Sequence, residues 1–276
     1  KAQWVKGVYK NIWIEQFKKM SLLAYDKADT VTCLFEHART LQIELGCPEE
    51  KIQVTPNGID VDGFADLPGK SQDEEQIISI GAVLRVSPIK DVKTMIQAFA
   101  FAKKRVPKLK LWIMGPTDED EKYAQECFDL VDSLGVSDIE FTGRVNVKEY
   151  LGRMDFTILT SISEGQPLTI LESYAAHKPT IATDVGNCRE LIYGNDDGFG
   201  AAGILTHIMN LEEIAQAMID LAIDPEGRKQ MGEAGYKRVT SFYRIEQMKE
   251  TYKEIYRRFA EEQQAGWTEE PFQLKR

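Results

Sequence analysis

From residue 77 onward, short runs of β-branched and apolar residues alternate with segments of helical periodicity, and this alternation limits the fold more than any other feature. Strands that alternate with helices build a parallel sheet with crossover helices. The runs that predict strands are 77–80, 109–114, 139–142, 156–160, 180–183 and 203–205. The helical patterns between them are 91–105, 119–134, 147–154, 167–177 and 187–193. We therefore expect one complete doubly wound α/β domain over 77–242.

The chain before this domain is organised differently. Helical patterns cover 8–28 and 36–45, strand patterns cover 30–34 and 51–55, and the turn Pro56-Asn57-Gly58-Ile59-Asp60 follows. Two strands do not make a lobe that stands alone, so we expect 1–63 to be the last part of a second α/β lobe whose beginning is absent. Polar residues with Pro and Gly predict an interdomain linker over 64–76.

The C-terminal part of the chain is helical by pattern. Apolar residues recur at helical spacing in 211–223, 226–242 and 245–262. We expect 243–262 to form a C-terminal helix that packs back on the first lobe, and 263–276 to be a flexible tail.

Charge and composition exclude several classes of protein. The 276 residues include 34 Lys and Arg against 44 Asp and Glu, a net charge of −10, whereas a general binder of nucleic acid is basic. Any anion site is therefore local, and nucleic acid is not an expected partner. No apolar run is long enough to span a membrane, and the sequence begins without a signal-peptide pattern. Four scattered cysteines without a C-x-x-C pair fit a reduced, cytoplasmic setting.

The segment 161–172 is the most informative for function. It follows the predicted strand that ends at Thr160, turns through Gly165, and places Pro167 at the first position of a helix. A loop between the carboxyl end of a parallel strand and a helix N-terminus is where α/β sheets hold phosphate. The segment therefore predicts a phosphate site.

The helix that begins there has a narrow polar stripe of Thr169, Glu172 and Ser173, which we expect to face a cleft. Glu172 lies about 4.5 Å further along the axis than Thr169, at 1.5 Å per residue. This is about the step from a diphosphate to its ribose, whose hydroxyl protons a carboxylate can accept. The alternative is that Glu172 is an exposed helix residue and Glu164 an ordinary loop acid.

A second loop, 81–91, also joins a predicted strand to a helix. Its cations Arg85 and Lys90 could neutralise a leaving diphosphate without a metal, with Asp91 as the N-cap of the helix. The sequence has no acidic pair such as Asp-x-Asp near either loop, which favours this interpretation. The alternative is that both side chains are simply solvated.

A third loop, 141–146, is less specific. The backbone of Arg144 and Val145 could hydrogen-bond a base edge, although a structural turn explains the spacing equally well. His37, His177 and His207 lack metal-ligand spacing, so no metal site is expected. The sequence has neither the dinucleotide fingerprint nor the P-loop nor the nucleophile-elbow motif, which disfavours a Rossmann oxidoreductase.

Glu164 and Glu172 form an E-x7-E pattern that resembles the retaining GT-B glycosyltransferases of family GT4. The turn 56–60 is similar to that family's segment before the interdomain linker. The runs 80–94, 161–168 and 183–190 are similar to the PelF-type members, the cytosolic glycosyltransferases of Pel exopolysaccharide synthesis. The resemblance covers about residues 22 to 260.

The resemblance implies a GT-B fold and a role for each candidate residue. Arg85 and Lys90 would bind the donor diphosphate, and the amides of Leu168 and Thr169 would meet the phosphate. Glu164 would position the donor sugar together with the amides of Gly165, Gln166 and the neighbours of Pro167. Glu172 would hold the ribose, and Arg144 and Val145 would flank the base. Transfer would retain configuration without a metal or cofactor. The implied partners are UDP-glucose, a carbohydrate acceptor and a membrane-bound polysaccharide synthase complex.

The sequence departs from the family pattern at specific places. Arg85 comes four residues after Gly81 instead of directly after a glycine, and Lys90 precedes Asp91 instead of a glycine. His177 stands where many relatives have Gly at a helix end, a position that favours positive φ. Most of the acceptor lobe, with its usual histidine, is missing, so the chain is expected to be a truncated enzyme. The competing hypothesis is a non-catalytic nucleotide-sugar-binding or assembly module.

Overall fold

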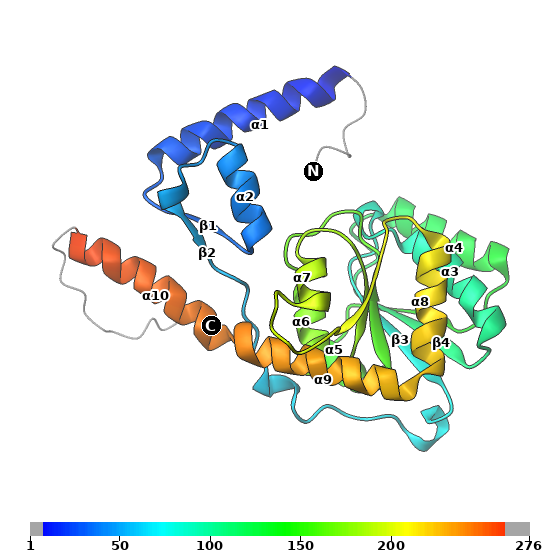
Figure 1. Ribbon diagram of the computed structural model, residues 1–276. Coiled ribbons are helices and arrows are strands. Elements are labelled where there is room, and N and C mark those ends of the chain that lie inside the picture. Colours follow the sequence, from blue (N-terminus) through cyan, green and yellow to red (C-terminus); the bar gives the residue numbers. More distant parts are fainter. Residues whose placement is uncertain (1–7, 263–276) are drawn as a thin grey trace.

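The computed structural model describes residues 8–262 and places six parallel strands in one sheet (Figure 1). The strands are β3 (Ile78–Val83), β4 (Leu109–Met114), β5 (Ile139–Gly143), β6 (Phe156–Leu159), β7 (Thr180–Thr183) and β8 (Gly203–Thr206). Their order is β5-β4-β3-β6-β7-β8, so the chain winds outward from β3 in one direction and then from β6 in the other. The expected doubly wound α/β sheet is confirmed. The predicted tail 263–276 lies outside the described residues.

The helices cover both faces of this sheet. They are α3 (Val92–Arg105), α4 (Glu121–Leu134), α5 (Val147–Leu151), α6 (Leu168–Ala175), α7 (Cys188–Tyr193), α8 (Leu211–Ile223) and α9 (Pro225–Phe242). A further helix, α10 (Ile245–Glu262), follows α9 and extends away from the sheet (Figure 1). One apolar core lies between the strands and α3, α4 and α8, and a second lies between the strands and α5, α6, α7 and α9. The sheet is buried on both faces, which explains its continuous apolar runs.

The largest difference from the predicted strands is at β3, which continues to Val83 instead of ending at residue 80. Gly81 and Ala82 stay in the sheet, opposite Trp112 and Ile113 of β4. A Cβ at Gly81 would lie 2.8 Å from Cγ of Met154, so the glycine permits close packing over the sheet. Gly81 therefore marks a place where the Met154 side chain approaches the strand closely, and not a turn.

The N-terminal part of the described chain is smaller. It contains α1 (Val8–Lys27), β1 (Val31–Cys33), α2 (Glu36–Glu44) and β2 (Ile52–Val54), and β1 pairs with β2 in parallel. We call residues 8–54 the N-terminal segment and residues 78–242 the sheet domain. No helix within 8–262 has the length and apolar character needed to cross a bilayer.

Two passages of chain connect the N-terminal segment to the rest. The two passages pair with each other, because the Ile59 amide donates to the Tyr243 carbonyl and the Ile245 amide donates to the Ile59 carbonyl, each over 2.9 Å. The second passage continues as α10, which runs back towards the N-terminal segment (Figure 1), and Arg258 donates to Oγ1 of Thr30 over 3.0 Å. The two lobes are thus joined where the chain crosses between them.

The segment with linker composition lies fixed against the sheet domain. Glu74 forms an ion pair with Arg153 that lowers the pKa of the Glu74 carboxyl to about 2. Lys70 pairs with Asp155 and donates to the carbonyl of Ile77 over 2.6 Å. The polar residues of the segment 64–76 therefore anchor it to the sheet domain.

Candidate active site

The candidate site lies where the strand order reverses, between β3 and β6. In doubly wound sheets, ligands bind in the crevice at the carboxyl ends of the two strands that flank this point. The loops that leave β3 and β6 run side by side here, because the Ile162 amide donates to the Ile89 carbonyl over 2.9 Å. Oγ1 of Thr160 also donates to the Lys90 carbonyl over 2.9 Å. The structure thus brings together the two loops that carry Arg85, Lys90 and Glu164.

Lys90 and Glu164 meet directly at this junction. Nζ of Lys90 lies 2.5 Å from Oε1 of Glu164, and the two side chains are 17% and 12% exposed. A pair this shielded from water interacts more strongly than a surface ion pair. The cation of one loop is therefore held by the acid of the other.

Arg85 extends in another direction. It pairs with Glu119, which follows β4, over 2.8 Å. Arg144, from the loop after β5, pairs with Asp118 over 3.1 Å and lies 3.9 Å from the same Glu119. Since β4 and β6 flank β3, Arg85 and Lys90 pair with acids on opposite sides of β3. The structure does not hold the two cations as one preformed clamp.

Glu119 was not among the predicted site residues, because the helical pattern over 119–134 includes it. The helix α4 begins at Glu121, with Asp120 as its N-cap. Glu119 therefore belongs to the loop at the carboxyl end of β4. An acid directly after a predicted strand, on the same sheet edge as Arg85, was the signal that could have identified it.

Asp91 occupies the N-cap position of α3, as expected, but its side chain makes no capping hydrogen bond. Its backbone is left-handed, with φ of 48° and ψ of 47°, whereas capping side chains need an extended backbone. The carboxyl is buried, which raises its pKa, and its Oδ2 has no hydrogen-bond partner among the described residues. The predicted N-cap position is thus confirmed.

Helix α6 places its first turn at the same junction. The helix begins at Leu168, so Pro167 is its N-cap and not its first helical residue. The amides of Leu168 and Thr169 have no acceptor within the helix and carry the positive end of its dipole. Leu168 is 46% exposed, so a ligand can reach this end.

The predicted polar stripe of α6 is divided between two environments. Ser173 is 1% exposed and bonds to the carbonyl of Thr169 over 2.7 Å and to the hydroxyl of Thr157 over 2.9 Å. The expectation that Ser173 faces a cleft is wrong, because its hydroxyl is satisfied against β6. Glu172 is only partly buried.

The charge of Lys148, a residue not predicted for the site, acts on Glu172. Burial raises the pKa of Glu172, and the charge of Lys148 opposes this shift. Lys148 lies in α5, directly after the β5 loop, and its Nζ sits 4.7 Å from the Phe64 ring centroid. Within 8–262, Glu172 forms no ion pair with Arg85 or Lys90. A cation in the first turn after the Arg144 loop was the available signal.

The side chain of Gln166 connects the β6 loop to the N-terminal segment. Gln166 is 5% exposed, and its Oε1 accepts from the Asn57 amide over 2.6 Å. Its Nε2 donates to the Leu34 carbonyl over 3.3 Å. Of the neighbouring predicted residues, Gly165 is exposed and Val145 packs on the second core. The Gln166 carbonyl also accepts from Nδ2 of Asn57 over 3.1 Å, so only the backbone amide of Gln166 is left for a donor.

No cluster of three His, Cys, Asp or Glu side chains suited to a metal ion occurs among residues 8–262. The charges at the junction are instead those of Arg85, Lys90 and Arg144, each set against an acid. Such an arrangement can exchange its internal acids for the oxygens of a bound diphosphate, because phosphate accepts the same charge-assisted hydrogen bonds.

Comparisons with known proteins agree with this architecture. The chain is 30% identical over 241 residues to N-acetyl-alpha-D-glucosaminyl L-malate synthase of Bacillus anthracis, covering 84% of this chain and 60% of that relative. It is 30% identical over 168 residues to the putative glycosyltransferase EpsD of Bacillus subtilis, covering 59% and 42%. The chain thus spans 60% of the length of the first of these relatives.

Solved structures show the same fold at lower identity. Anabaena HepE, in complex with UDP and glucose, superposes with a TM-score of 0.74 at 19% identity, covering 88% of this chain and 67% of that one. Sucrose-phosphate synthase of Thermosynechococcus elongatus superposes with a TM-score of 0.76 at 17% identity, covering 90% and 62%.

Two family models match the sequence. Residues 1–50 match a domain of unknown function, DUF3492. Residues 65–238 match the model described as glycosyl transferases group 1, which is more than half of the chain. The protein therefore belongs to the group 1 glycosyl transferases, and its parallel sheet is that of a GT-B fold.

Proposed function

We propose that this chain carries the donor-binding half of a retaining glycosyltransferase that takes its sugar from UDP-glucose. The observation that carries the proposal is the contact of Lys90 with Glu164 at the N-terminus of α6, at the point where the strand order reverses. A cation, an acid and free helix amides thus surround one site. A sugar nucleotide has groups that fit this site, because its diphosphate can bind the cation and the amides and its sugar hydroxyls can donate to the acid.

Binding follows from an exchange of partners. The diphosphate takes Lys90, and Glu164 is released to accept a hydrogen bond from a sugar hydroxyl. Arg85 leaves Glu119 for the phosphate in the same way, and the amides of Leu168 and Thr169 complete the site. Glu172 accepts the ribose hydroxyl protons, while Arg144 and Val145 flank the base. Both cations stabilise the leaving diphosphate, so the proposed reaction needs no metal.

The proposed transfer keeps the configuration of the sugar. The acceptor hydroxyl attacks the anomeric carbon from the face that the diphosphate leaves. The bond from that carbon to the diphosphate oxygen breaks, the bond to the acceptor oxygen forms, and the departing phosphate oxygen takes the acceptor proton. Glu164 holds the sugar through the hydrogen bond from a sugar hydroxyl and forms no covalent bond with the anomeric carbon.

Exopolysaccharide synthesis is the proposed setting. The exopolysaccharide phosphotransferase SCO2592 of Streptomyces coelicolor is 30% identical to this chain over 230 residues, covering 80% of this chain and 22% of that protein. HepE is also described in complex with UDP-glucose. Together with the PelF-type motifs, these names support a cytoplasmic enzyme that serves a carbohydrate acceptor and a membrane-bound synthase complex.

Thermal melting with UDP tests the proposal. UDP should raise the melting temperature of the wild-type protein, since a ligand that binds only the folded state stabilises it. Arg85→Ala and Glu172→Ala should remove this shift, whereas Arg105→Ala, an exposed arginine at the other end of α3, should keep it. A wild-type protein that does not respond to UDP contradicts the proposal. A second assay joins the chain to an acceptor lobe and measures the release of UDP from UDP-glucose. Release of UDP indicates transfer, whereas a protein that only binds the sugar nucleotide releases none.

A further inference from the structure

The side chain of Gln166 connects the donor loop, residues 160–167 between β6 and α6, to chain outside the sheet domain. Its Oε1 accepts from the Asn57 amide over 2.6 Å, and its Nε2 donates to the Leu34 carbonyl over 3.3 Å. Nδ2 of Asn57 donates back to the Gln166 carbonyl over 3.1 Å. Leu34 follows β1 and Asn57 follows β2, so one residue of the donor loop is bonded to the chain that leaves both strands of the N-terminal segment.

The two partners of Gln166 require both ends of an amide. An amide side chain carries an acceptor oxygen and a donor nitrogen on one carbon, and here the oxygen faces an N–H and the nitrogen faces a C=O. Gln166 is 5% exposed, so a side chain without these groups would leave the Asn57 amide and the Leu34 carbonyl unpaired where water has little access. Leaving such groups unpaired is costly.

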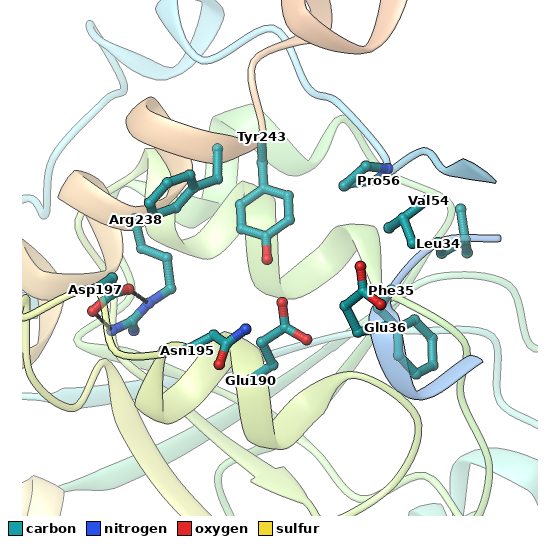
Figure 2. Close-up of a pocket in the computed structure, with 12 residues that line it drawn as sticks. Leu34, Phe35, Glu36, Val54, Pro56, Glu190, Asn195, Asp197, Arg238 and Tyr243 are labelled. Atoms are coloured by element: carbon teal, nitrogen blue, oxygen red, sulfur yellow. Dashed lines mark hydrogen bonds and ion pairs between the residues drawn. The ribbon is translucent and has the colours of Figure 1, made fainter. Parts of the chain in front are cut away.

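The contact between the lobes is interrupted beside these bonds. A cavity of about 330 Å³ lies between the N-terminal segment and the sheet domain (Figure 2). Its lining residues include Leu34, Val54 and Pro56 on one side and Asp197 and Arg238 on the other. Side chains do not fill this space, so the hydrogen bonds of Gln166 contribute more to the contact near the donor loop than they would in a closely packed interface.

Gln166 lies between two parts of the proposed donor site. Glu164 is two residues before it, and Pro167, the N-cap of α6, follows it directly. Proline fixes its own φ and restricts the backbone of the residue before it, so a displacement of Gln166 also displaces the first turn of α6. The Gly165 carbonyl accepts from the Asn187 amide of the sheet domain over 2.8 Å. The donor loop is thus held from both lobes.

We propose that Gln166 is a positioning residue whose side chain couples the donor site to the N-terminal segment. With both hydrogen bonds made, the donor loop holds Glu164 and the free amides of α6 where a sugar nucleotide binds them. When the segment moves away, the bonds break and the loop leaves that position. The coupling is reciprocal, so a bound donor also strengthens the docking of the segment. This inference rests on the proposed donor site and adds a residue that acts on it through the loop.

Titration calorimetry with UDP tests the coupling. Gln166→Met keeps the approximate size of the side chain and removes both of its hydrogen bonds, so its affinity for UDP should be about tenfold weaker than that of the wild type. Gln216→Met is the matched control. Gln216 is an exposed glutamine of α8, and its variant should bind UDP as the wild type does.

Gln166→Glu gives a readout that a merely structural role would not produce. Its carboxyl still accepts from the Asn57 amide, but it repels the Leu34 carbonyl when ionised and donates to it when protonated. Its affinity for UDP should therefore be about tenfold below that of the wild type at about pH 8 and within about threefold at about pH 5, since a shielded carboxyl keeps its proton to higher pH than an exposed one. Lys90 and Glu164 are common to both proteins, so their titration cancels in the ratio of the affinities.

Spin labels measure the docking itself. All four native cysteines are buried, so the labels are attached at Glu44→Cys on α2 and Lys237→Cys on α9, two exposed positions. With Gln166 in place, UDP should narrow the distribution of distances between the labels. In Gln166→Met the distribution should be broader, and UDP should not narrow it.

The outcomes separate this inference from the proposed function. A wild-type protein that does not bind UDP overturns the donor site and the coupling with it. If the wild type binds UDP and Gln166→Met binds it equally well, the coupling is overturned and the donor site stands. The same holds if UDP narrows the label distances in Gln166→Met as it does in the wild type. If Gln166→Met does not fold, Gln166→Glu decides, and an affinity ratio that does not change with pH overturns the coupling.

Discussion

Nζ of Lys90 lies 2.5 Å from Oε1 of Glu164, although 74 residues separate them in the sequence. The contact joins the loop after β3 to the loop after β6, which are the two loops on either side of the reversal in strand order. Both side chains are largely shielded from water. The same two groups therefore stabilise the junction in the empty protein and are proposed to separate when the diphosphate enters.

Lys90→Met should lower the free energy of unfolding by about 2 kcal/mol, because it leaves the Glu164 carboxylate shielded from water without its cation. The double variant Lys90→Met/Glu164→Gln should lose less than the sum of the single changes. Urea unfolding of the four proteins measures this coupling. Lys93→Met removes the cation of a more exposed pair with Glu126 and should change stability by less than about 1 kcal/mol. Equal losses at positions 90 and 93 would contradict the assigned role of the buried pair.

Glu172→Gln should make the protein more stable at neutral pH. Burial raises the pKa of Glu172 above its ordinary value of 4.5, so the folded state keeps this proton at pH values where the unfolded chain has released it. The stability that this group contributes is present at low pH and is lost as the pH rises through the raised pKa. Glutamine stays neutral and avoids the loss.

The measurement is the melting temperature of Glu172→Gln minus that of the wild type, from about pH 4 to about pH 8. The difference should be close to zero at the acid end and positive at the neutral end. UDP should stabilise the variant less than the wild type at neutral pH, because a neutral amide oxygen accepts weaker hydrogen bonds from the ribose hydroxyls than a carboxylate does. A difference that is constant with pH would mean that the Glu172 carboxyl is not destabilised by burial.

The fold was predictable because its signals are local. Apolar runs and helical patterns give the strands and helices to within a few residues, and the parallel α/β sheet follows from their alternation. The two loops of the site could be paired from the same pattern, since carboxyl ends of parallel strands share one edge. Strand β3 was predicted too short, because a glycine that permits contact with Met154 reads as a turn.

The partners of the site residues could not be predicted in the same way. Arg85 was expected to act beside Lys90, but its partner Glu119 belongs to the neighbouring strand β4, and strand order is not local in sequence. Ser173 has the right spacing to face a cleft, yet its hydroxyl is used against β6. Gln166 is committed to Asn57, 109 residues away. Side-chain partners across strands or lobes depend on tertiary packing.

His177→Gly should be more stable than His177→Ala by about 1 kcal/mol, because residue 177 has a left-handed backbone that only glycine adopts without strain. The structure gives His177 a φ of 56°, just after the end of α6. Its ring stacks on Tyr236 with centroids 3.9 Å apart, and its Nδ1 lies 2.9 Å from Glu233.

Both variants lose these ring contacts, so their comparison isolates the backbone. Chemical unfolding of the two proteins measures the difference. Alanine and glycine variants of equal stability would show that the left-handed backbone at this position is not strained in the protein.

Gly186→Ala should weaken UDP binding, whereas Gly135→Ala should not. Both glycines have positive φ, 55° and 58°. A Cβ at Gly186 would collide with the carbonyl oxygens of Glu164 and Gly165, while one at Gly135 would meet no atom of the described chain within 4 Å. The first change therefore displaces the loop that holds Glu164, and the second introduces backbone strain alone.

Each alanine should destabilise the fold by about 1 to 2 kcal/mol through its left-handed backbone, with the larger loss at Gly186. Calorimetric titration with UDP should give a weaker affinity for Gly186→Ala by about tenfold, a change of about 1.4 kcal/mol, and a wild-type affinity for Gly135→Ala. Comparing the two variants separates loop displacement from general destabilisation, because both carry the strain and only one moves Glu164. If both bind UDP as the wild type does, the position of the Glu164 loop does not govern donor binding, and the site must be sought elsewhere on the sheet edge.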